Sequence, residues 1–263
     1  MATILAAARD CASDLPQVFR HIESIEAQFG EHRFVAFEND SRDDTRLLLE
    51  GFCRASPDAR ELIVAHNFGE KISRTERLGR IRNTLLARAR HHGLPLVIMM
   101  DVDEVNTWIN LDGVRGAISR IQNGRVDVAT ASQYLTYYDK FALRTGAEPP
   151  RCRDELVLKL GFAACPLHAF DLQQSAIESA FGGFAIFRLE DAEGCAYDGR
   201  ADCEHVAFNG CLRQKNARIE IVNELKNIGY DARFASHFAW ALLLTLVAVV
   251  SARMTRRGLL DRA

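Results

Sequence analysis

The stretch that decides the fold is LVIMMDVDEV, at residues 96–105. Its first five residues are apolar and long enough to cross a buried parallel sheet, and the carboxylates Asp101 and Asp103 follow. In an open α/β sheet, ligands bind in the crevice beyond the carboxyl ends of the strands. A carboxylate pair there is suited to hold a divalent metal ion against a phosphate group, because hard cations prefer oxygen ligands. An acidic turn after a core strand is the alternative interpretation.

Strand and helix patterns alternate on both sides of this stretch. The expected strands are 3–8, 34–37, 62–65, 96–100 and 126–130, and the expected helices are 14–29, 47–52, 71–90 and 112–121. This alternation predicts an α/β fold with a doubly wound, mostly parallel sheet, helices on both faces and right-handed connections. A less regular second half follows, with further strands expected at 156–160 and 184–187.

Polar residues come directly after the expected strands. Because the carboxyl ends of parallel strands meet at one edge of a sheet, these side chains should line one rim. They are Arg9, Asp10, Glu38, Asn39, Asp40, His66, Asn67, Asp101 and Asp103. The first strand is followed by neither a dinucleotide fingerprint nor a Walker A sequence, which disfavours hydride transfer and P-loop chemistry.

The charge of the 263-residue chain is balanced, with 33 basic and 35 acidic side chains and a formal charge of −2. It has no basic stripe of the kind that binds nucleic acid, so we expect no nucleic-acid partner. The seven cysteines include no CxxC pair. This pattern indicates buried thiols in a reducing cytoplasm, and the spacing of Cys195, Cys203 and Cys211 matches no zinc site.

The composition changes near the carboxyl end. Residues 238–252 are apolar or small without interruption, and three arginines follow closely. A helix of that length covers about 22 Å, less than the roughly 30 Å hydrocarbon core of a bilayer. We expect a cytoplasmic protein with one domain at 1–233 and an apolar tail helix at 234–263 that contacts a membrane through 234–257. A buried terminal helix is the alternative.

Several short motifs occur in a fixed order along the chain. They are ENDSRDDT at 38–45, GRIRN at 79–83, DVD at 101–103 and YDKF at 138–141, with Arg144 and Gly146. Together they resemble the GT-A fold glycosyltransferases over about residues 3–225, and in motifs most closely the capsular α-1,3-mannosyltransferase group. This resemblance implies a nucleotide-binding half at 1–110 and an acceptor half at 111–233.

The resemblance implies a metal-dependent transfer of a sugar from a nucleoside-diphosphate sugar to a hydroxyl of a glycan or lipid-linked acceptor. The narrower resemblance to the capsular group implies that this sugar is mannose. The implied cofactor is Mn²⁺ or Mg²⁺, held by Asp103 and Asp101, with His205 as a further metal ligand. The expected donor-binding residues are Arg9, Glu38, Asn39, Asp40, Arg82 and Asp101. Among the cations of helix 71–90, Arg82 is preferred over Lys71 and Arg74 for the phosphates, because Arg82 belongs to the GRIRN motif.

The acceptor side is expected to include Gly182, Gly183, Asp139 and Arg144. In the sequence DCEHV at 202–206, Glu204 is the candidate general base and, with Asp103, the candidate catalytic pair. If this segment is a strand, Glu204 and His205 point to opposite faces and only one reaches the site.

A phosphohydrolase of the haloacid-dehalogenase type is the main alternative, because residues 98–105 also resemble its nucleophile strand. Asp101 would then be the nucleophile and Asp103 the acid/base. The strand normally opens that domain, whereas about a hundred residues precede it here, and the late metal loop has the wrong order at 198–202. A nucleotidyltransferase and a non-catalytic binding module are further alternatives.

Overall fold

The computed structural model describes residues 1–69, 71–133, 137, 139, 141–145 and 176–227. The expected strand at 156–160 and the expected tail helix at 234–263 lie outside these residues. The division into one domain at 1–233 and a tail therefore stays a prediction.

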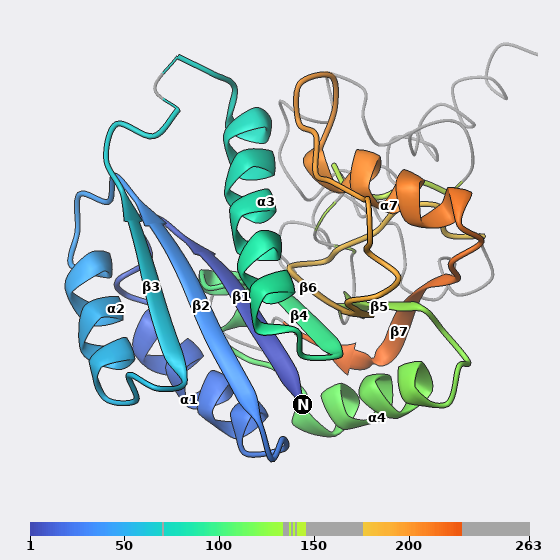
Figure 1. Cartoon of the computed structure of the whole chain (residues 1–263), viewed down its shortest axis with the longest axis horizontal. Coiled ribbons are helices and arrows are strands. Elements are labelled where there is room, and N and C mark those ends of the chain that lie inside the picture. Colours follow the sequence, from blue (N-terminus) through green and yellow to red (C-terminus); the bar gives the residue numbers. More distant parts are fainter. Residues whose placement is uncertain (70, 134–136, 138, 140, 146–175, 228–263) are drawn as a thin grey trace, which may run out of the picture.

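A seven-stranded mixed sheet forms the centre of the molecule (Figure 1). The strand order is β3-β2-β1-β4-β6-β5-β7; the first four strands of this order are parallel, and β6 is antiparallel to both neighbours. The strands are β1 (Ala2–Ala8), β2 (His32–Asn39), β3 (Arg60–Ala65), β4 (Leu96–Asp101), β5 (Val128–Ser132), β6 (Phe184–Arg188) and β7 (Ile219–Lys226). The predicted doubly wound, mostly parallel sheet is confirmed.

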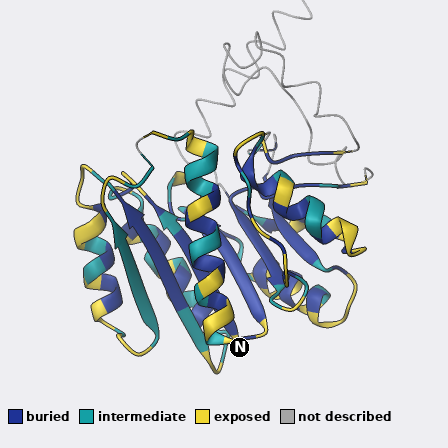
Figure 2. Ribbon diagram, turned by 45° about the horizontal axis from the view of Figure 1, so that its top comes forward, coloured by how far each residue is buried: buried dark blue, intermediate teal, exposed yellow. Residues whose placement is uncertain are grey.

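Helices cover both faces of the sheet, as predicted, and turn their exposed residues outward (Figure 2). Helices α1 (Leu15–Glu26), α2 (Thr45–Arg54) and α4 (Leu111–Gln122) pack on one face. Helices α3 (Arg74–His92) and α7 (Glu204–Gln214) pack on the other. A short 3₁₀ turn, η1 (Glu104–Asn106), follows β4.

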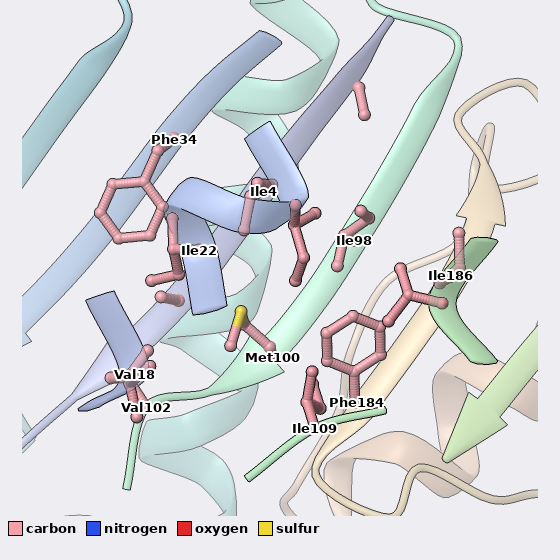
Figure 3. Close-up of a cluster of buried hydrophobic side chains, with 14 of the residues drawn as sticks. Ile4, Val18, Ile22, Phe34, Ile98, Met100, Val102, Ile109, Phe184 and Ile186 are labelled. Carbon is pink, nitrogen blue, oxygen red and sulfur yellow. The ribbon is translucent and has the colours of Figure 1, made fainter. Parts of the chain in front are cut away.

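The central strands are buried on both faces. In β4, Ile98 and Met100 belong to the cluster under α1 and α4 (Figure 3), whereas Val97 and Met99 belong to the cluster under α3 and α7. Successive strand residues point to opposite faces, so a strand covered on both sides has to be apolar throughout. This explains the uninterrupted apolar run that ends at Asp101.

The expectation that only one of Glu204 and His205 reaches the site is wrong, because both residues lie in a helix and not in a strand, and both line one cavity. Helix α7 begins at Glu204 and β7 follows it, an element that the periodicity did not reveal. In the first turn of a helix, consecutive side chains are only about 100° apart. Glu204 and His205 are therefore able to face the same cavity.

The expectation of reduced thiols is also partly wrong. Cys195 and Cys211 form a disulfide across 16 residues, with their Cα atoms 5.7 Å apart, which joins the loop before α7 to that helix. Cys11, Cys53 and Cys203 are free and buried, as expected for structural thiols. Spacing alone does not reveal a pairing, because it depends on how the chain returns on itself.

The predicted cytoplasmic location with membrane contact is wrong as far as the structure reaches. Within the described ranges, no helix is long and apolar enough to cross a bilayer. Residues 234–257, on which the prediction rested, lie outside those ranges, so nothing in the structure supports it.

Candidate active site

Hydrogen bonds join the loops that follow β1 and β2. The hydroxyl of Thr45 accepts a hydrogen bond from the backbone N–H of Cys11 at 2.8 Å. The carboxylate of Asp10 accepts one from the N–H of Arg42 at 2.7 Å. Side-chain oxygens thus replace the backbone partners that these turns lack, and they fix the edge of the sheet where a ligand can bind.

The acidic residues of the loop after β2 serve this same purpose. Glu38 is buried and accepts a hydrogen bond from the N–H of Ser41 at 2.8 Å. Asp40 accepts hydrogen bonds from the N–H groups of Asn67 and Phe68, at 2.6 and 3.0 Å, and so connects the loops after β2 and β3. Both carboxylates thus accept hydrogen bonds from backbone N–H groups of the protein, and the donor-binding role expected for them stays a prediction.

A cavity of about 620 Å³ opens beyond the carboxyl ends of β1 and β4 and extends to the starts of α3 and α7. It brings together most of the residues singled out in the sequence. Those that line it are Arg9, Asn39, Arg82, Asp101, Asp103, Asp139, Glu204 and His205. Those that do not line it are Glu38, Asp40, Gly182, Gly183 and Arg144.

Arg82 connects the two ends of the predicted site. Its Nη2 lies 3.0 Å from Oδ1 of Asp101, and its Nε lies 3.1 Å from Oε1 of Glu204. Arg82 and Glu204 are each only 3% exposed. A buried guanidinium needs such partners to offset its desolvation. In the structure Arg82 thus contacts two carboxylates of the protein, and its expected contact with phosphates stays a prediction.

The GRIRN motif attaches α3 to the loop before α7. A Cβ on Gly79 would lie 3.2 Å from the backbone nitrogen of Gly199, so this glycine lets the loop approach closely. The side chain of Asn83 donates to the carbonyl of Tyr197 and accepts from its N–H, both at 2.8 Å. The motif thus places Glu204 at the cavity.

His205 is held in an apolar sandwich. Its ring stacks on Phe181 with centroids 3.9 Å apart, and Tyr197 meets it edge-on at 5.4 Å. Burial, and then the charge of Arg82, lower the pKa of His205 well below its usual value. The imidazole is therefore neutral at pH 7.

The Asp101 and Asp103 pair meets the chemical requirements of a divalent cation. Burial and the charge of Asp101 raise the pKa of Asp103 to about 7, and a cation between the two carboxylates would relieve both effects. No group of three His, Cys, Asp or Glu residues suited to a metal occurs in the described part of the chain. The expected role of His205 as a third ligand stays a prediction. A metal held by one or two carboxylates takes its other ligands from phosphates and water.

A cationic cluster lies on the same cavity. It consists of Arg9 after β1 and of Arg74 and Arg77 in the first turn of α3. Burial and the charges of Arg9 and Arg74 lower the pKa of Arg77. The sequence interpretation included Arg9 and considered Arg74, but it missed Arg77, because a helix with many cations does not show which of them face a cavity. Such a cluster favours an anionic ligand.

The two glycines expected on the acceptor side have packing roles. Gly182 and Gly183 have φ angles of 66° and 81°. A Cβ on Gly182 would lie 2.6 Å from the carbonyl oxygen of Ala131, and one on Gly183 would lie 2.7 Å from Cγ1 of Val105. Only glycine satisfies both the backbone conformation and the close approach.

The other two expected acceptor residues differ from each other. Arg144 lies 2.5 Å from a carboxylate oxygen of Asp202 and donates to two backbone carbonyls, so its guanidinium is used within the fold. Asp139 is half-buried and lines the cavity. Burial and the nearby charges of Asp101 and Glu204 raise the pKa of Asp139 to about 7, although a hydrogen bond from the backbone of Ala142 opposes the shift.

The raised pKa of Asp139 predicts a pH effect on stability. The folded protein keeps this proton up to about pH 7, whereas the unfolded chain loses it near pH 4. The free energy of unfolding should therefore fall as pH rises through this window. Asp139→Asn should reduce that fall by roughly 1–3 kcal/mol, measured by urea unfolding at pH 4.5 and 7.5. Asp112→Asn, on an exposed helix turn, is the control, and an unchanged pH slope for Asp139→Asn would contradict the prediction.

Solved structures share the fold of this chain. TarS from S. aureus matches as a 1–349 fragment with a TM-score of 0.51 and 16% identity, covering 86% of this chain and 59% of the fragment. A longer TarS chain matches with a TM-score of 0.52 and 16% identity, covering 86% of this chain and 36% of its own length. The chain has a GT-A-like fold. It spans less than two thirds of the TarS chains.

Two further matches come from complexes. TarS 1–349 with UDP-GlcNAc has a TM-score of 0.50 and 14% identity, covering 86% of this chain and 57% of that one. The mannosyltransferase PcManGT from Pyrobaculum calidifontis, with GDP-Man and Mn²⁺, has a TM-score of 0.49 and 14% identity, covering 93% of this chain and 64% of that one. No family model and no curated protein sequence matches the chain. The narrower resemblance to the capsular α-1,3-mannosyltransferases is not confirmed.

Proposed function

We propose that this protein is a metal-dependent glycosyltransferase that moves a sugar from a nucleoside-diphosphate sugar to a hydroxyl of a glycan or lipid-linked acceptor. The observation that carries the proposal is that one cavity in a GT-A-like fold is lined by both basic and acidic side chains. The cationic cluster of Arg9, Arg74 and Arg77 lines this cavity, and so do Asp101 and Asp103. The mannosyl donor is a narrower proposal, which rests on the motifs alone.

The cationic cluster suits the diphosphate of the donor. Arg74 and Arg77 lie in the first turn of α3, where the backbone N–H groups and the helix dipole also favour an anion. Arginine binds phosphate oxygens through two parallel hydrogen bonds. TarS, which shares the fold, has been solved with UDP-GlcNAc, and a donor of this chemical class fits the cationic cluster.

The carboxylates have separate tasks in this proposal. Asp103 and Asp101 would hold Mn²⁺ or Mg²⁺, which supplies charge neutralisation for the leaving diphosphate. Glu204 takes the proton from the acceptor hydroxyl in an inverting reaction. Arg82 fixes the carboxylates of Asp101 and Glu204 relative to each other, through contacts of 3.0 and 3.1 Å. Because the base and the metal ligand share one partner, both are aligned before the substrate binds.

The phosphohydrolase alternative gains no support from this geometry. It requires the carboxylate of Asp101 to attack a phosphate, yet Oδ1 of Asp101 accepts a hydrogen bond from Arg82. Asp101 also ends the fourth strand of the chain rather than the first.

A thermal-shift screen over nucleotide sugars with MnCl₂ tests the proposal. We expect at least one of UDP-glucose, UDP-GlcNAc and GDP-mannose to raise the melting temperature by several degrees. At a hundredfold excess over Kd, bound ligand raises the free energy of unfolding by about 3 kcal/mol. The shift should require Mn²⁺ or Mg²⁺. No shift with any donor, together with hydrolysis of p-nitrophenyl phosphate, would favour the hydrolase instead.

Arg77→Ala tests the diphosphate site. UDP binding with Mn²⁺ should weaken by about 10-fold in calorimetry, because one charge-assisted contact is lost. Arg80→Ala is the matched control, since Arg80 lies on the same helix, is exposed and pairs with Glu76. Equal UDP affinities for the two variants would show that the cluster does not bind the phosphates.

A further inference from the structure

Two buried side chains on the cavity wall each retain a nitrogen that has no hydrogen-bond partner among the described residues. They are Nη1 of Arg82 and Nε2 of His205. The two residues are 3% and 4% exposed, and both line the cavity. An unpaired polar group costs free energy when it is buried, so such groups usually have a partner. Because both residues line the cavity, a ligand bound there is the candidate partner.

The two side chains meet at one oxygen of Glu204. Nε of Arg82 is 3.1 Å and Nε2 of His205 is 3.7 Å from the same oxygen of Glu204, Oε1. The guanidinium carbon of Arg82 lies 4.7 Å from the ring centroid of Phe181, on which His205 also stacks. The pair is thus held in place by one aromatic ring and one carboxylate.

The chemistry of the pair selects a hydroxyl group. Arg82 Nη1 only donates hydrogen bonds, whereas a neutral imidazole has one nitrogen that can accept. A hydroxyl offers the matching acceptor and donor at a single oxygen. An anion fits less well, because Arg82, the cation of this pair, already faces the carboxylates of Asp101 and Glu204.

We propose that Arg82 and His205 form a subsite for one hydroxyl of a neutral sugar, beside Glu204. This inference rests on the proposed glycosyl transfer and narrows its substrate to sugars that carry no acidic group at this position. The hydroxyl can come from the donor sugar or from the acceptor, and the two sources have separate tests. In either case this proposal makes His205 a binding residue, in place of the metal ligand expected from the sequence.

The donor test uses calorimetry with UDP, UDP-glucose, GDP and GDP-mannose in MnCl₂. The measured quantity is the ratio of the Kd of the nucleoside diphosphate to that of its nucleotide sugar. His205→Phe keeps an aromatic ring over Phe181 but removes the nitrogen, and it should lower this ratio about fivefold. The Kd of UDP or GDP should stay unchanged, which shows that the variant is folded. His205→Gln, which supplies a polar group again, should recover part of the ratio.

The acceptor test measures the KM for methyl α-D-mannopyranoside at a saturating donor concentration. If the hydroxyl belongs to the acceptor, His205→Phe should raise this KM about fivefold and leave the donor ratio unchanged. Unchanged values in both tests would overturn the inference.

The charge argument has its own test. UDP-glucose and UDP-glucuronate differ only in a hydroxymethyl group and a carboxylate, and wild-type protein should bind UDP-glucose more tightly. Tighter binding of UDP-glucuronate would overturn the inference, because Arg82 would then be taking an anion. If neither UDP nor GDP binds the wild-type protein with Mn²⁺, the proposed function itself fails, and this outcome is distinct from loss of the sugar contribution alone.

Discussion

Replacing Asp103 with alanine should abolish the contribution of Mn²⁺ to nucleotide binding and lower glycosyl transfer by about 100-fold or more. Asp103 is the second residue after the end of β4, and burial and the charge of Asp101 raise its pKa to about 7. Removing it takes away one of two metal ligands. It also removes like-charge repulsion, so the metal-free variant should be at least as stable as the wild type.

Glu104→Ala is the matched control for this variant. Glu104 is the next carboxylate in the chain, is exposed and does not line the cavity. Calorimetric titrations of UDP with and without MnCl₂ separate the two variants, because only Asp103→Ala should lose the difference between the two conditions. A Mn²⁺ effect of wild-type size in Asp103→Ala would rule out the metal role of Asp103.

Replacing Arg82 with methionine should strongly destabilise the folded protein. The substitution leaves the carboxylates of Asp101 and Glu204 without their shared cation, and Glu204 is only 3% exposed. Loss of one partner from a buried ion pair costs about 3–5 kcal/mol. This corresponds to a drop in melting temperature of roughly 10 °C for a chain of this size. Transfer activity should fall as well, since both carboxylates lose their alignment.

Arg80→Met is the control for Arg82→Met, on the same helix. The side chain of Arg80 is 59% exposed and pairs with Glu76, so its loss should cost less than about 0.5 kcal/mol. Adding Glu204→Gln to Arg82→Met should restore part of the lost stability, because one unpaired charge becomes neutral. Equal melting temperatures for Arg82→Met and Arg80→Met would contradict the role of Arg82 as a buried partner of two carboxylates.

Local sequence patterns predicted the sheet well because the signals are strong and short-range. A strand covered on both faces has to be apolar at every position, and the run before Asp101 shows this directly. The carboxyl ends of parallel strands share one edge, so topology alone places Arg9, Asn39, Asp101 and Asp103 on one cavity. The helices before β4 were also predicted from a local signal, because each has one apolar face.

The roles within the motifs depended on contacts far apart in the chain. Arg82 looks in the sequence like one of many helix cations, yet its partners are 19 and 122 residues away. Asp40 looks in the sequence like a ligand for a nucleotide, and in the structure it accepts hydrogen bonds from the backbone N–H groups of residues 67 and 68. A polar side chain does not reveal in the sequence whether a ligand or the protein itself will satisfy it.

The sequence by itself therefore determined the α/β architecture, the edge of the sheet that carries the candidate site, and the position of Asp101 and Asp103 at that edge. These follow from burial and strand direction, which are properties of neighbouring residues. Only the tertiary structure decided that Arg82 binds two carboxylates, that Glu204 and His205 both reach the cavity from the first turn of α7, and that Arg77 joins the cationic cluster. These outcomes depend on which distant segments meet, because a buried charge or polar group is stable only beside a partner that packing brings to it.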